Sequence, residues 1–407
     1  MCDWAPMYPQ VTIDFIVELG TALHRYGTPA HRLEAALCSM AQTLGMEAQV
    51  LSTPTSIMVG FGRPGDLRTA MVRVEPGAHN LEKLAAVDDL AERVAHKQIT
   101  PEDAIEQLHG IREASNRVGP ILSTLAFPVV SAASASFLGG APPDLAVAAG
   151  SGLAVGFLAL QIPRTTAGGR IFELLAALVV ASVAHLSSVA GWGVSYDIVL
   201  LAGLIALVPG LALTVGMTEI ATRNLVSGTA RLMASAIVFL EIIFGVALSE
   251  QLLTHLLQAP SVVGGSPVVA WLQYPALGFA CLGAAALFKA HPRAFPIITL
   301  TAIAAFYSAR LGAHYLSSEL GACAGGFVAA AIANTYARRR NRSALVPLVP
   351  GLILLVPGSL GFRSLSSLWE QDIVSGIDGA FKMVLVAISL VAGILVANAV
   401  VLPRRSL

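Results

Sequence analysis

Charged residues are scarce in this chain of 407 residues: they make up 12% of it, while apolar residues make up 55% and the mean hydropathy is +0.72. Soluble domains carry roughly 25% charged residues, so most of this chain is too apolar to cover a globular surface. A formal net charge of zero also disfavours a nucleic-acid-binding protein, because phosphates require a basic surface. The composition therefore predicts a protein that has the lipid bilayer as a partner and no nucleic acid partner.

Cysteines are few, and the common catalytic motifs are missing. The four cysteines, Cys2, Cys38, Cys281 and Cys323, lie far apart without a CxxC pair, which predicts buried thiols rather than disulfides or a metal cluster. The sequence contains no GxSxG, HExxH or P-loop motif, so the usual parts of a hydrolase, a zinc protease or an ATP-driven pump are lacking. We therefore expect a protein that is not an enzyme and that holds no cofactor or metal.

The charges that are present are densest in the first part of the chain. Residues 1–118 hold 10 Lys/Arg and 15 Asp/Glu, an ordinary density for a soluble domain, whereas residues 119–407 hold only 15 and 10. This predicts a soluble domain over 1–118 and a membrane domain over 119–407. Asp14, Glu18, His24 and Arg25 interrupt the first apolar stretch, so the N-terminus is not expected to act as a secretory signal peptide.

The soluble domain is predicted to be a small α+β domain. Amphipathic patterns predict helices over residues 11–26 and 29–44. Runs rich in Val, Ile, Thr and Met over 47–61 and 67–74 predict two or three strands. Two further helices, over 80–96 and 101–115, are expected because Asn80 and Thr100 are typical N-caps and Pro101 suits the first helical position.

One spacing in this domain admits a metal site as an alternative. His31 and Glu34 lie three residues apart on a predicted helix, and His24 lies seven residues before His31. A third well-placed ligand is missing, so a solvated helix face is the simpler interpretation of these side chains.

Ten stretches in the membrane domain have the roughly 20 predominantly apolar residues that a crossing needs. They cover residues 120–138, 144–162, 171–190, 198–217, 229–249, 268–288, 295–313, 316–336, 344–362 and 379–402. With the soluble domain in the cytoplasm, the inside connections hold twelve Lys/Arg and the outside connections three, as the positive-inside rule requires. An even number of crossings then places both termini inside. The inside residues are Arg164, Arg170, Arg223, Arg231, Lys289, Arg293, Arg338, Arg339, Arg340, Arg342, Arg404 and Arg405, and the outside ones are Arg310, Arg363 and Lys382.

An internal repeat divides the membrane domain into two halves. The five residues Leu207–Leu211 recur as Leu348–Leu352, and seven of the nine positions that begin at Leu207 and Leu348 are identical. The copies lie in the fourth and ninth stretches, so each is the fourth member of a five-helix half. Because five is odd, the halves, 119–262 and 263–407, are predicted to be inverted repeats. The predicted fold is thus an all-α polytopic bundle of about ten transmembrane helices, preceded by the α+β domain.

Proline and glycine interruptions at corresponding places in two inverted halves are typical of a transporter binding site. There, freed backbone groups can face a substrate or an ion instead of lipid. The candidate positions are Pro209, Gly210, Pro350 and Gly351, with a second break at Pro357, Gly358 and Ser359. A pair of simple helix kinks is the alternative interpretation.

Ionisable residues inside a membrane are costly and are therefore candidates for function. Glu241 lies near the middle of the fifth stretch, and Glu219 lies just beyond the first Pro-Gly break. We expect Glu219 and Arg231 to form a charge pair beside the breaks, with Glu219 at a cytoplasmic mouth that water reaches. Glu219 and Glu241 are the candidate proton carriers.

Several motifs together resemble the threonine/serine exporter family over essentially the whole chain. The N-terminal set is Gly20, Gly27, Arg32, Glu34, Ser52–Ser56, Arg73, Asn80, Leu81 and Leu84. The membrane set is Pro209–Leu211, Glu219, Val226–Leu232 and Val356–Arg363. The resemblance implies a cytoplasmic N-terminal domain, ten spanning helices in a bacterial cytoplasmic membrane, and export of small hydroxy amino acids driven by the proton motive force.

From this resemblance we expect a secondary transporter whose partners are threonine or serine, protons and lipid, and a homo-oligomer is compatible with it. Thr214 and Ser359 are candidates for hydrogen bonds to the substrate hydroxyl. Two alternatives stay open. One is export of a dicarboxylate such as succinate, for which Arg231 and Arg363 are the available cations. The other is a membrane-bound enzyme whose soluble domain is catalytic.

Overall fold

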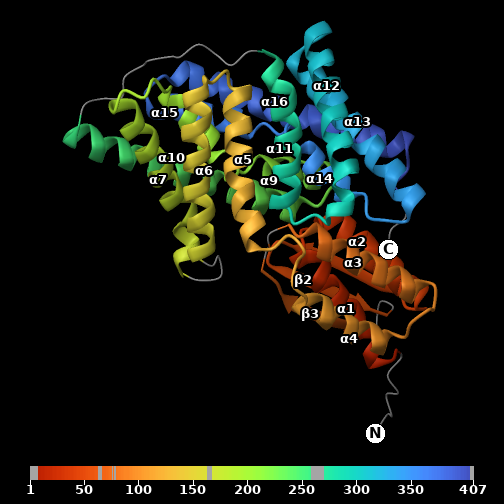
Figure 1. The fold of residues 1–407 in the computed structure, drawn as a ribbon. Coiled ribbons are helices and arrows are strands. Elements are labelled where there is room, and N and C mark those ends of the chain that lie inside the picture. The colour runs from red at the N-terminus through yellow and green to blue at the C-terminus, as the bar shows by residue number, and fades with distance from the viewer. Residues whose placement is uncertain are drawn as a thin grey trace.

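The computed structural model describes residues 8–62, 67–75, 77, 79–162, 167–257 and 270–403. An N-terminal domain, drawn in red and orange, lies against one end of a larger helical part (Figure 1). Arg164, Arg404 and Arg405 of the charge count, the start of the predicted stretch 268–288 and the predicted boundary between 262 and 263 lie outside the described residues.

The N-terminal domain combines four helices with a three-stranded antiparallel sheet of order β1-β2-β3. The predicted α+β elements are confirmed, including the helix starts. Asn80 Oδ1 accepts the backbone N–H of Lys83 at 3.1 Å, and Thr100 Oγ1 accepts that of Asp103 at 3.2 Å. The elements are α1 (Gln10–Arg25), α2 (Ala30–Thr43), β1 (Ala48–Thr53), β2 (Ser56–Phe61), β3 (Arg68–Arg73), α3 (Leu81–Ala95) and α4 (Pro101–Glu113).

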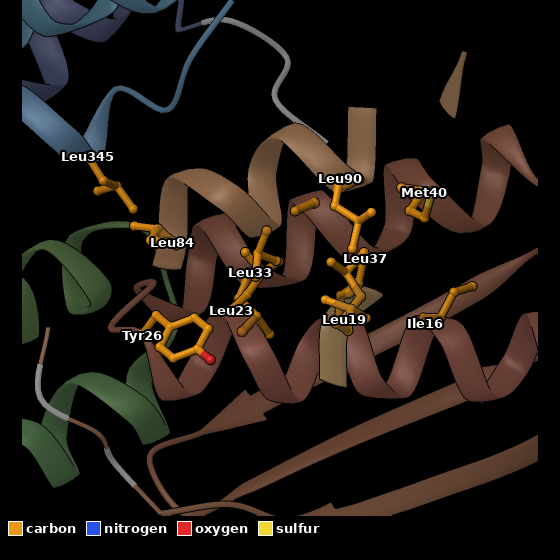
Figure 2. Packing of buried hydrophobic residues seen from close by; sticks show 14 of the residues in the cluster. Ile16, Leu19, Leu23, Tyr26, Leu33, Leu37, Met40, Leu84, Leu90 and Leu345 are labelled. Atoms are coloured by element: carbon orange, nitrogen blue, oxygen red, sulfur yellow. The ribbon is translucent and has the colours of Figure 1, made fainter. Parts of the chain in front are cut away.

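The core of this domain extends into the helical part. Leu19, Leu33 and Leu37 pack between α1, α2 and the sheet, and all three are fully buried. The same apolar cluster reaches Leu345 of the helical part, whose side chain lies beside Leu84 at the start of α3 (Figure 2). Because burial of apolar surface is favourable wherever it occurs, this shared core fixes the N-terminal domain against the helices.

The helical part runs from α5 to α16. Its helices are α5 (Pro120–Phe137), α6 (Pro142–Gln161), α7 (Phe172–Val189), α8 (Tyr196–Leu204), α9 (Gly210–Ala221), α10 (Leu225–Leu256), α11 (Gln273–Leu287), α12 (Phe295–Tyr315), α13 (Ser318–Arg340), α14 (Leu345–Leu352), α15 (Gly358–Trp369) and α16 (Ile373–Val400). Short 3₁₀ turns cover Ala167–Ile171, Ala270–Leu272 and Pro292–Ala294. In the described residues, seven helices are long and apolar enough to cross a membrane, namely α5, α6, α7, α10, α12, α13 and α16. The chain is therefore a polytopic, mostly helical membrane protein.

Two of the ten predicted crossings are divided into pairs of short helices. Stretch 198–217 consists of α8 and α9, which are separated by residues 205–209, and stretch 344–362 consists of α14 and α15, which are separated by residues 353–357. Pro209 and Pro357 directly precede α9 and α15, where the missing N–H and the clash of the proline ring with the preceding turn favour a break. Stretch 268–288 contains the 15-residue helix α11, and the count of ten crossings stays a prediction.

Equivalent helices make equivalent contacts in the two halves of the helical part. In the first half α10 contacts α7 and α9, and in the second α16 contacts α13 and α15. A Cβ on Gly228 would collide with Ile220, and one on Gly376 would collide with Leu368. Gly376 and Leu368 lie 148 positions after Gly228 and Ile220, so a close helix contact of the first half recurs in the second half at a shift of 148.

Backbone hydrogen bonds add to the interface between the domains. The N–H groups of Leu81 and Glu82, at the start of α3, donate to the carbonyl groups of Phe288 and Lys289 at 3.0 and 3.1 Å. These carbonyls follow the end of α11, so two helix ends satisfy each other's unpaired backbone groups. The result is a directional attachment of the N-terminal domain to the second half of the helical part.

Candidate functional site

The two helix breaks meet in the interior of the helical part. Pro209 precedes α9 and Pro357 precedes α15, with similar backbone angles: φ −79° and ψ 38° for Pro209, φ −81° and ψ 32° for Pro357. A Cβ on Gly210 would lie 3.0 Å from the Cα of Gly358, and one on Gly358 would lie 3.2 Å from the Cα of Gly210. Only glycine allows this approach, which brings together the first turns of α9 and α15. Helix N-termini carry partial positive charge and free N–H groups.

The predicted pairing of the two breaks was wrong in the second half. Pro350 and Gly351 lie inside α14, not at its break, and Gly351 packs against Thr301 of α12. The segment that corresponds to residues 203–210 is residues 351–358, which is identical except that Leu354 replaces Ala206. Leu-Val-Pro-Gly occurs twice within 348–358, seven residues apart, so the sequence match at a shift of 141 selected the first copy instead of the second.

Hydroxyl groups lie close to the paired breaks. Thr214 is buried one turn into α9, where its Oγ1 donates to the carbonyl of Gly210 at 3.1 Å. Ser359, the second residue of α15, is half-buried. The structure therefore places both predicted hydroxyls in the first turns of the two helices that meet.

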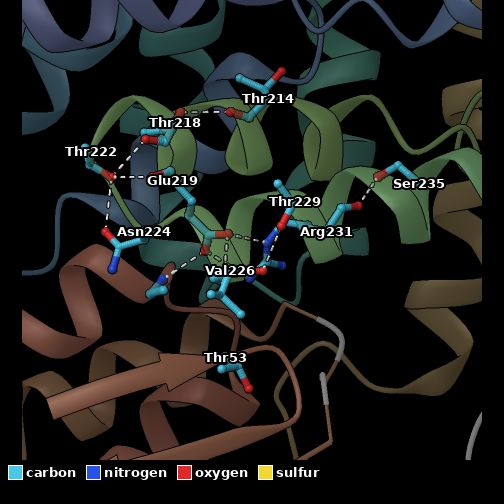
Figure 3. Close-up of polar contacts among 12 residues, drawn as sticks. Thr53, Thr214, Thr218, Glu219, Thr222, Asn224, Val226, Thr229, Arg231 and Ser235 are labelled. Atoms are coloured by element: carbon cyan, nitrogen blue, oxygen red, sulfur yellow. Dashed lines mark hydrogen bonds and ion pairs between the residues drawn. The ribbon is translucent and has the colours of Figure 1, made fainter.

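Glu219 lies at the opposite end of α9, where it receives hydrogen bonds from two domains. Its carboxylate accepts the N–H of Ala30 at 2.9 Å and the hydroxyl of Ser227 at 2.9 Å. Arg231 of α10 donates to both oxygens, from Nε at 3.1 Å and from its terminal guanidinium at 3.2 Å (Figure 3). Glu219 has 0% exposure, so in this structure it does not face an open mouth.

A second carboxylate joins the same two domains. Glu34 of α2 accepts the N–H of Ser52 at 2.8 Å and the side-chain amide of Asn224, in the α9–α10 connection, at 2.7 Å. Both oxygens of Glu34 are therefore engaged, which removes it from the metal site considered with His24 and His31. In the described residues no group of three His, Cys, Asp or Glu side chains is arranged to hold a metal ion.

Three histidines of the N-terminal domain, His24, His31 and His79, lie near these carboxylates and the domain interface. Burial, reinforced by Arg32, lowers the pKa of His31 to about 4, although Glu219 opposes the shift. Burial and Arg231 lower the pKa of His79 to about 4. Burial also lowers the pKa of His24, whose Nε2 lies 3.1 Å from the carbonyl oxygen of Thr53. These imidazoles are neutral at pH 7, so Arg231 is the cation that pairs with Glu219.

Glu241, the other candidate proton carrier, stands apart from this network. It lies on α10, ten residues beyond Arg231, and is half-buried. The structure thus gathers Pro209, Gly210, Thr214, Gly358 and Ser359 at one end of α9. It places Glu219 and Arg231 at the other end of α9, and leaves Pro350, Gly351 and Glu241 outside both groups.

Sequence reasoning missed the residues that link the domains. Asn224 and the N–H of Ala30 had no assigned role, because 189 and 190 positions separate the bonded residues across the interface. The one available signal was the set of motifs quoted for the family resemblance. Five residues of that set are hydrogen-bonded in two groups: Ser52 with Glu34, and Ser227 and Arg231 with Glu219.

Comparison with protein families finds two matches. The family model described as "Putative threonine/serine exporter" matches residues 14–253, and the model described as "Threonine/Serine exporter, ThrE" matches residues 275–400. Together they cover both the N-terminal domain and the helical part. No solved structure matches this chain.

Similar curated proteins come from yeasts. The chain is 28% identical to "Pheromone-regulated membrane protein 10" of Candida albicans (strain SC5314), over 90% of this chain and 34% of that protein. It is 27% identical to the protein of that name in Kluyveromyces lactis, over 86% and 38%, and 26% identical to that in Eremothecium gossypii, over 96% and 56%. The chain therefore spans about a third to a half of the length of these relatives.

Proposed function

Because this chain belongs to the threonine/serine exporter family, we propose that it is a secondary transporter that exports the hydroxy amino acids threonine and serine. The observation that carries the proposal is the contact between Gly210 and Gly358. It joins two Pro-Gly breaks of nearly identical sequence in the interior of the helical part. Where broken helices meet, unpaired backbone N–H and C=O groups become free to bind a substrate. The surrounding lipid offers these groups no hydrogen-bond partners.

The proposed architecture is a pair of inverted five-helix repeats with ten crossings. From the contact at Gly210 and Gly358, α9 leads to the N-terminal domain, whereas α15 lies toward the far end of the helical part (Figure 1). These opposite directions and the constant shift of 148 support inversion. The predicted excess of Lys/Arg in the inside connections, twelve against three, supports a cytoplasmic position for that domain and for both termini. A bacterial membrane is not part of the proposal, since the similar proteins named above are from yeasts.

In this proposal the substrate carboxylate binds at the converging N-termini of α9 and α15, where the helix dipoles favour an anion. Thr214 and Ser359 provide hydroxyl groups that can bond to the hydroxyl of threonine or serine. Binding of the substrate widens the contact at Gly210 and Gly358, because the two backbones leave no space for a ligand between them in this structure. Transport then requires movement of the two short helix pairs.

Proton coupling is assigned to Glu219. With all four of its bonds intact the carboxylate has no access to water. Release of the N-terminal domain removes the bond from Ala30 and exposes the Glu219–Arg231 pair, after which Glu219 can accept a proton. Glu241 on α10 is the alternative carrier.

The test is efflux of labelled threonine from proteoliposomes, with and without an inward proton gradient. We expect threonine and serine efflux that a proton gradient accelerates, and loss of that acceleration in Glu219→Gln, with threonine exchange retained. Efflux that is equal with and without the gradient would remove the proton-coupling claim, and loss of acceleration in Glu241→Gln alone would move the role to Glu241.

The same vesicles test the alternative substrate. A dicarboxylate needs two cationic partners, and Arg231 is already engaged by Glu219, which favours an amino acid. Succinate should therefore fail to compete with labelled threonine. If succinate competes and threonine efflux is absent, the protein is a dicarboxylate exporter instead.

A further inference from the structure

A pocket of about 390 Å³ opens between α8 and α15, at the end of α15 away from the paired breaks. We call it the α8–α15 pocket. α15 lies in the region of the helical part that is remote from the N-terminal domain (Figure 1). The lining residues that matter here are Asp197, Phe362, Arg363, Ser366, Ser367 and Glu370.

The lining combines one cation, two carboxylates and two hydroxyl groups. In the described residues, the guanidinium of Arg363 and the carboxylate of Asp197 have no hydrogen bond or ion pair, and Glu370 accepts only a long hydrogen bond of 3.4 Å from Ser366. An α-amino acid presents a carboxylate, for which a guanidinium is the best two-point donor, and an ammonium, which pairs with a carboxylate. The charges of this pocket therefore match a zwitterion.

The pocket begins about one helical turn from the helix breaks and extends away from them. Leu200 and Leu201 line it from α8, which ends three residues later at Leu204. Phe362 lines it from α15, four residues or about one turn after Gly358. The pocket therefore lies next along α15 after the paired breaks.

The repeat identifies an equivalent place on the other side of the breaks, and there it is filled. Adding 148 to the numbers of the α8 pocket residues gives their equivalents, 345–349 of α14. Subtracting 148 from those of the α15 pocket residues gives 214–222 of α9. Leu345 (Figure 2), Val346 and Val349 belong to the apolar core of the N-terminal domain. Glu219, the equivalent of Ser367, accepts the N–H of Ala30 (Figure 3).

One of two equivalent recesses is therefore open, and the N-terminal domain occupies the other. We propose that the α8–α15 pocket binds the zwitterionic hydroxy amino acid on the external side of the membrane, with Arg363 on its carboxylate and Asp197 or Glu370 on its ammonium. This inference rests on the proposed transport function, because it assigns the pocket to the pathway through the breaks. It adds a second, external binding position to the one between α9 and α15.

The experiment is exchange in vesicles sorted so that the N-terminal domain faces the lumen, with unlabelled threonine inside and labelled threonine outside. Arg363→Gln should raise the external half-saturation concentration at least tenfold and leave the saturating rate within twofold. Arg363→Lys keeps the charge but loses the two-point geometry, so it should give an intermediate value. Arg310→Gln removes an exposed arginine at the end of α12, outside the pocket, and should match the wild type.

A second readout separates binding from a merely structural role. Ethanolamine has the hydroxyl and ammonium of serine without its carboxylate, so it should inhibit the wild type and Arg363→Gln equally, while serine inhibits the variant much less. Unchanged external half-saturation in Arg363→Gln, alongside wild-type exchange, would overturn the pocket assignment and leave the transport proposal standing. Wild-type vesicles without threonine or serine exchange would overturn both.

Discussion

Glu219 illustrates how burial changes the meaning of a charged residue. Its place two to three turns after the Pro-Gly break led us to expect a water-accessible carboxylate. The structure instead surrounds it with an arginine, a hydroxyl and an N–H from the N-terminal domain. The sequence predicts that Glu219 lies near Arg231, but it does not predict the hydrogen bond that Glu219 accepts from Ala30 of the N-terminal domain. This bond depends on a tertiary approach that no local pattern records.

Replacing Glu219 should destabilise the protein. Glu219→Gln leaves Arg231 without its counter-ion, and removing one partner of a buried pair costs about 3 kcal/mol. We expect a lower thermal unfolding midpoint in detergent. Asp378→Asn is the matched control, since its pair with Lys382 is 57% exposed at both side chains and such pairs contribute about 0–1 kcal/mol. Equal midpoints for Glu219→Gln and Asp378→Asn would show that the Glu219 network does not hold the fold.

The histidines predict how stability depends on pH. The folded pKa of His31 and of His79 is about 4, whereas an unfolded histidine has a pKa of about 6.5. Between these values the unfolded chain binds protons that the folded chain does not. The free energy of unfolding should therefore be independent of these groups above pH 6.5 and decrease as the pH falls from 6.5 toward 4.

Unfolding midpoints measured from pH 8 to pH 5 test this sign. His31→Gln cannot take up the proton, so its midpoint should fall less than that of the wild type over this range. His314→Gln, which changes an exposed histidine at the end of α12, should follow the wild type. A His31→Gln curve parallel to the wild-type curve would contradict the assigned neutral state of His31.

At the scale of elements, the sequence predicted where helices start and misassigned one helix break. Asn80 and Thr100 cap their helices because capping is local: donor and acceptor are three residues apart. The break in the second half required a choice between two identical Leu-Val-Pro-Gly segments. Packing decides it: Gly358 faces Gly210, while Gly351 faces Thr301. Such a choice depends on partners more than 140 residues away.

The two prolines of the second half should therefore differ in importance. Pro357→Ala restores an N–H and removes the clash that keeps α14 and α15 separate, so we expect loss of threonine efflux from proteoliposomes. Pro350→Ala lies within α14, where alanine is a good helix former, and efflux should stay near the wild-type rate. A larger loss of efflux in Pro350→Ala than in Pro357→Ala would instead favour the pairing of Pro209 with Pro350, at a shift of 141.

At the scale of the whole molecule, the N-terminal domain covers one end of the helical part. The shared core at Leu345, the network of Glu219 and the bond between Glu34 and Asn224 all act on the same face. Composition alone predicts a soluble part and a membrane part, because charge density reflects exposure to water. It could not show that the two are fastened together, since an interface uses the same residue types as a domain core.

The proposed pathway depends on the glycine contact at the breaks. Gly210→Ala or Gly358→Ala adds a methyl group where the facing backbone is about 3 Å away, and overpacking of this kind costs about 1–3 kcal/mol. Gly150→Ala is the matched control, because a Cβ on Gly150 of α6 meets no atom within 4 Å. The protein yield and elution volume of all three variants identify any that fail to fold.

The most direct measurement is therefore the efflux rate of labelled threonine from proteoliposomes that contain the wild type, Gly358→Ala or Gly150→Ala at equal protein density. We expect efflux by the wild type and by Gly150→Ala at similar rates, and a loss of at least tenfold in folded Gly358→Ala. Efflux by Gly358→Ala at the wild-type rate would contradict a pathway through the paired breaks.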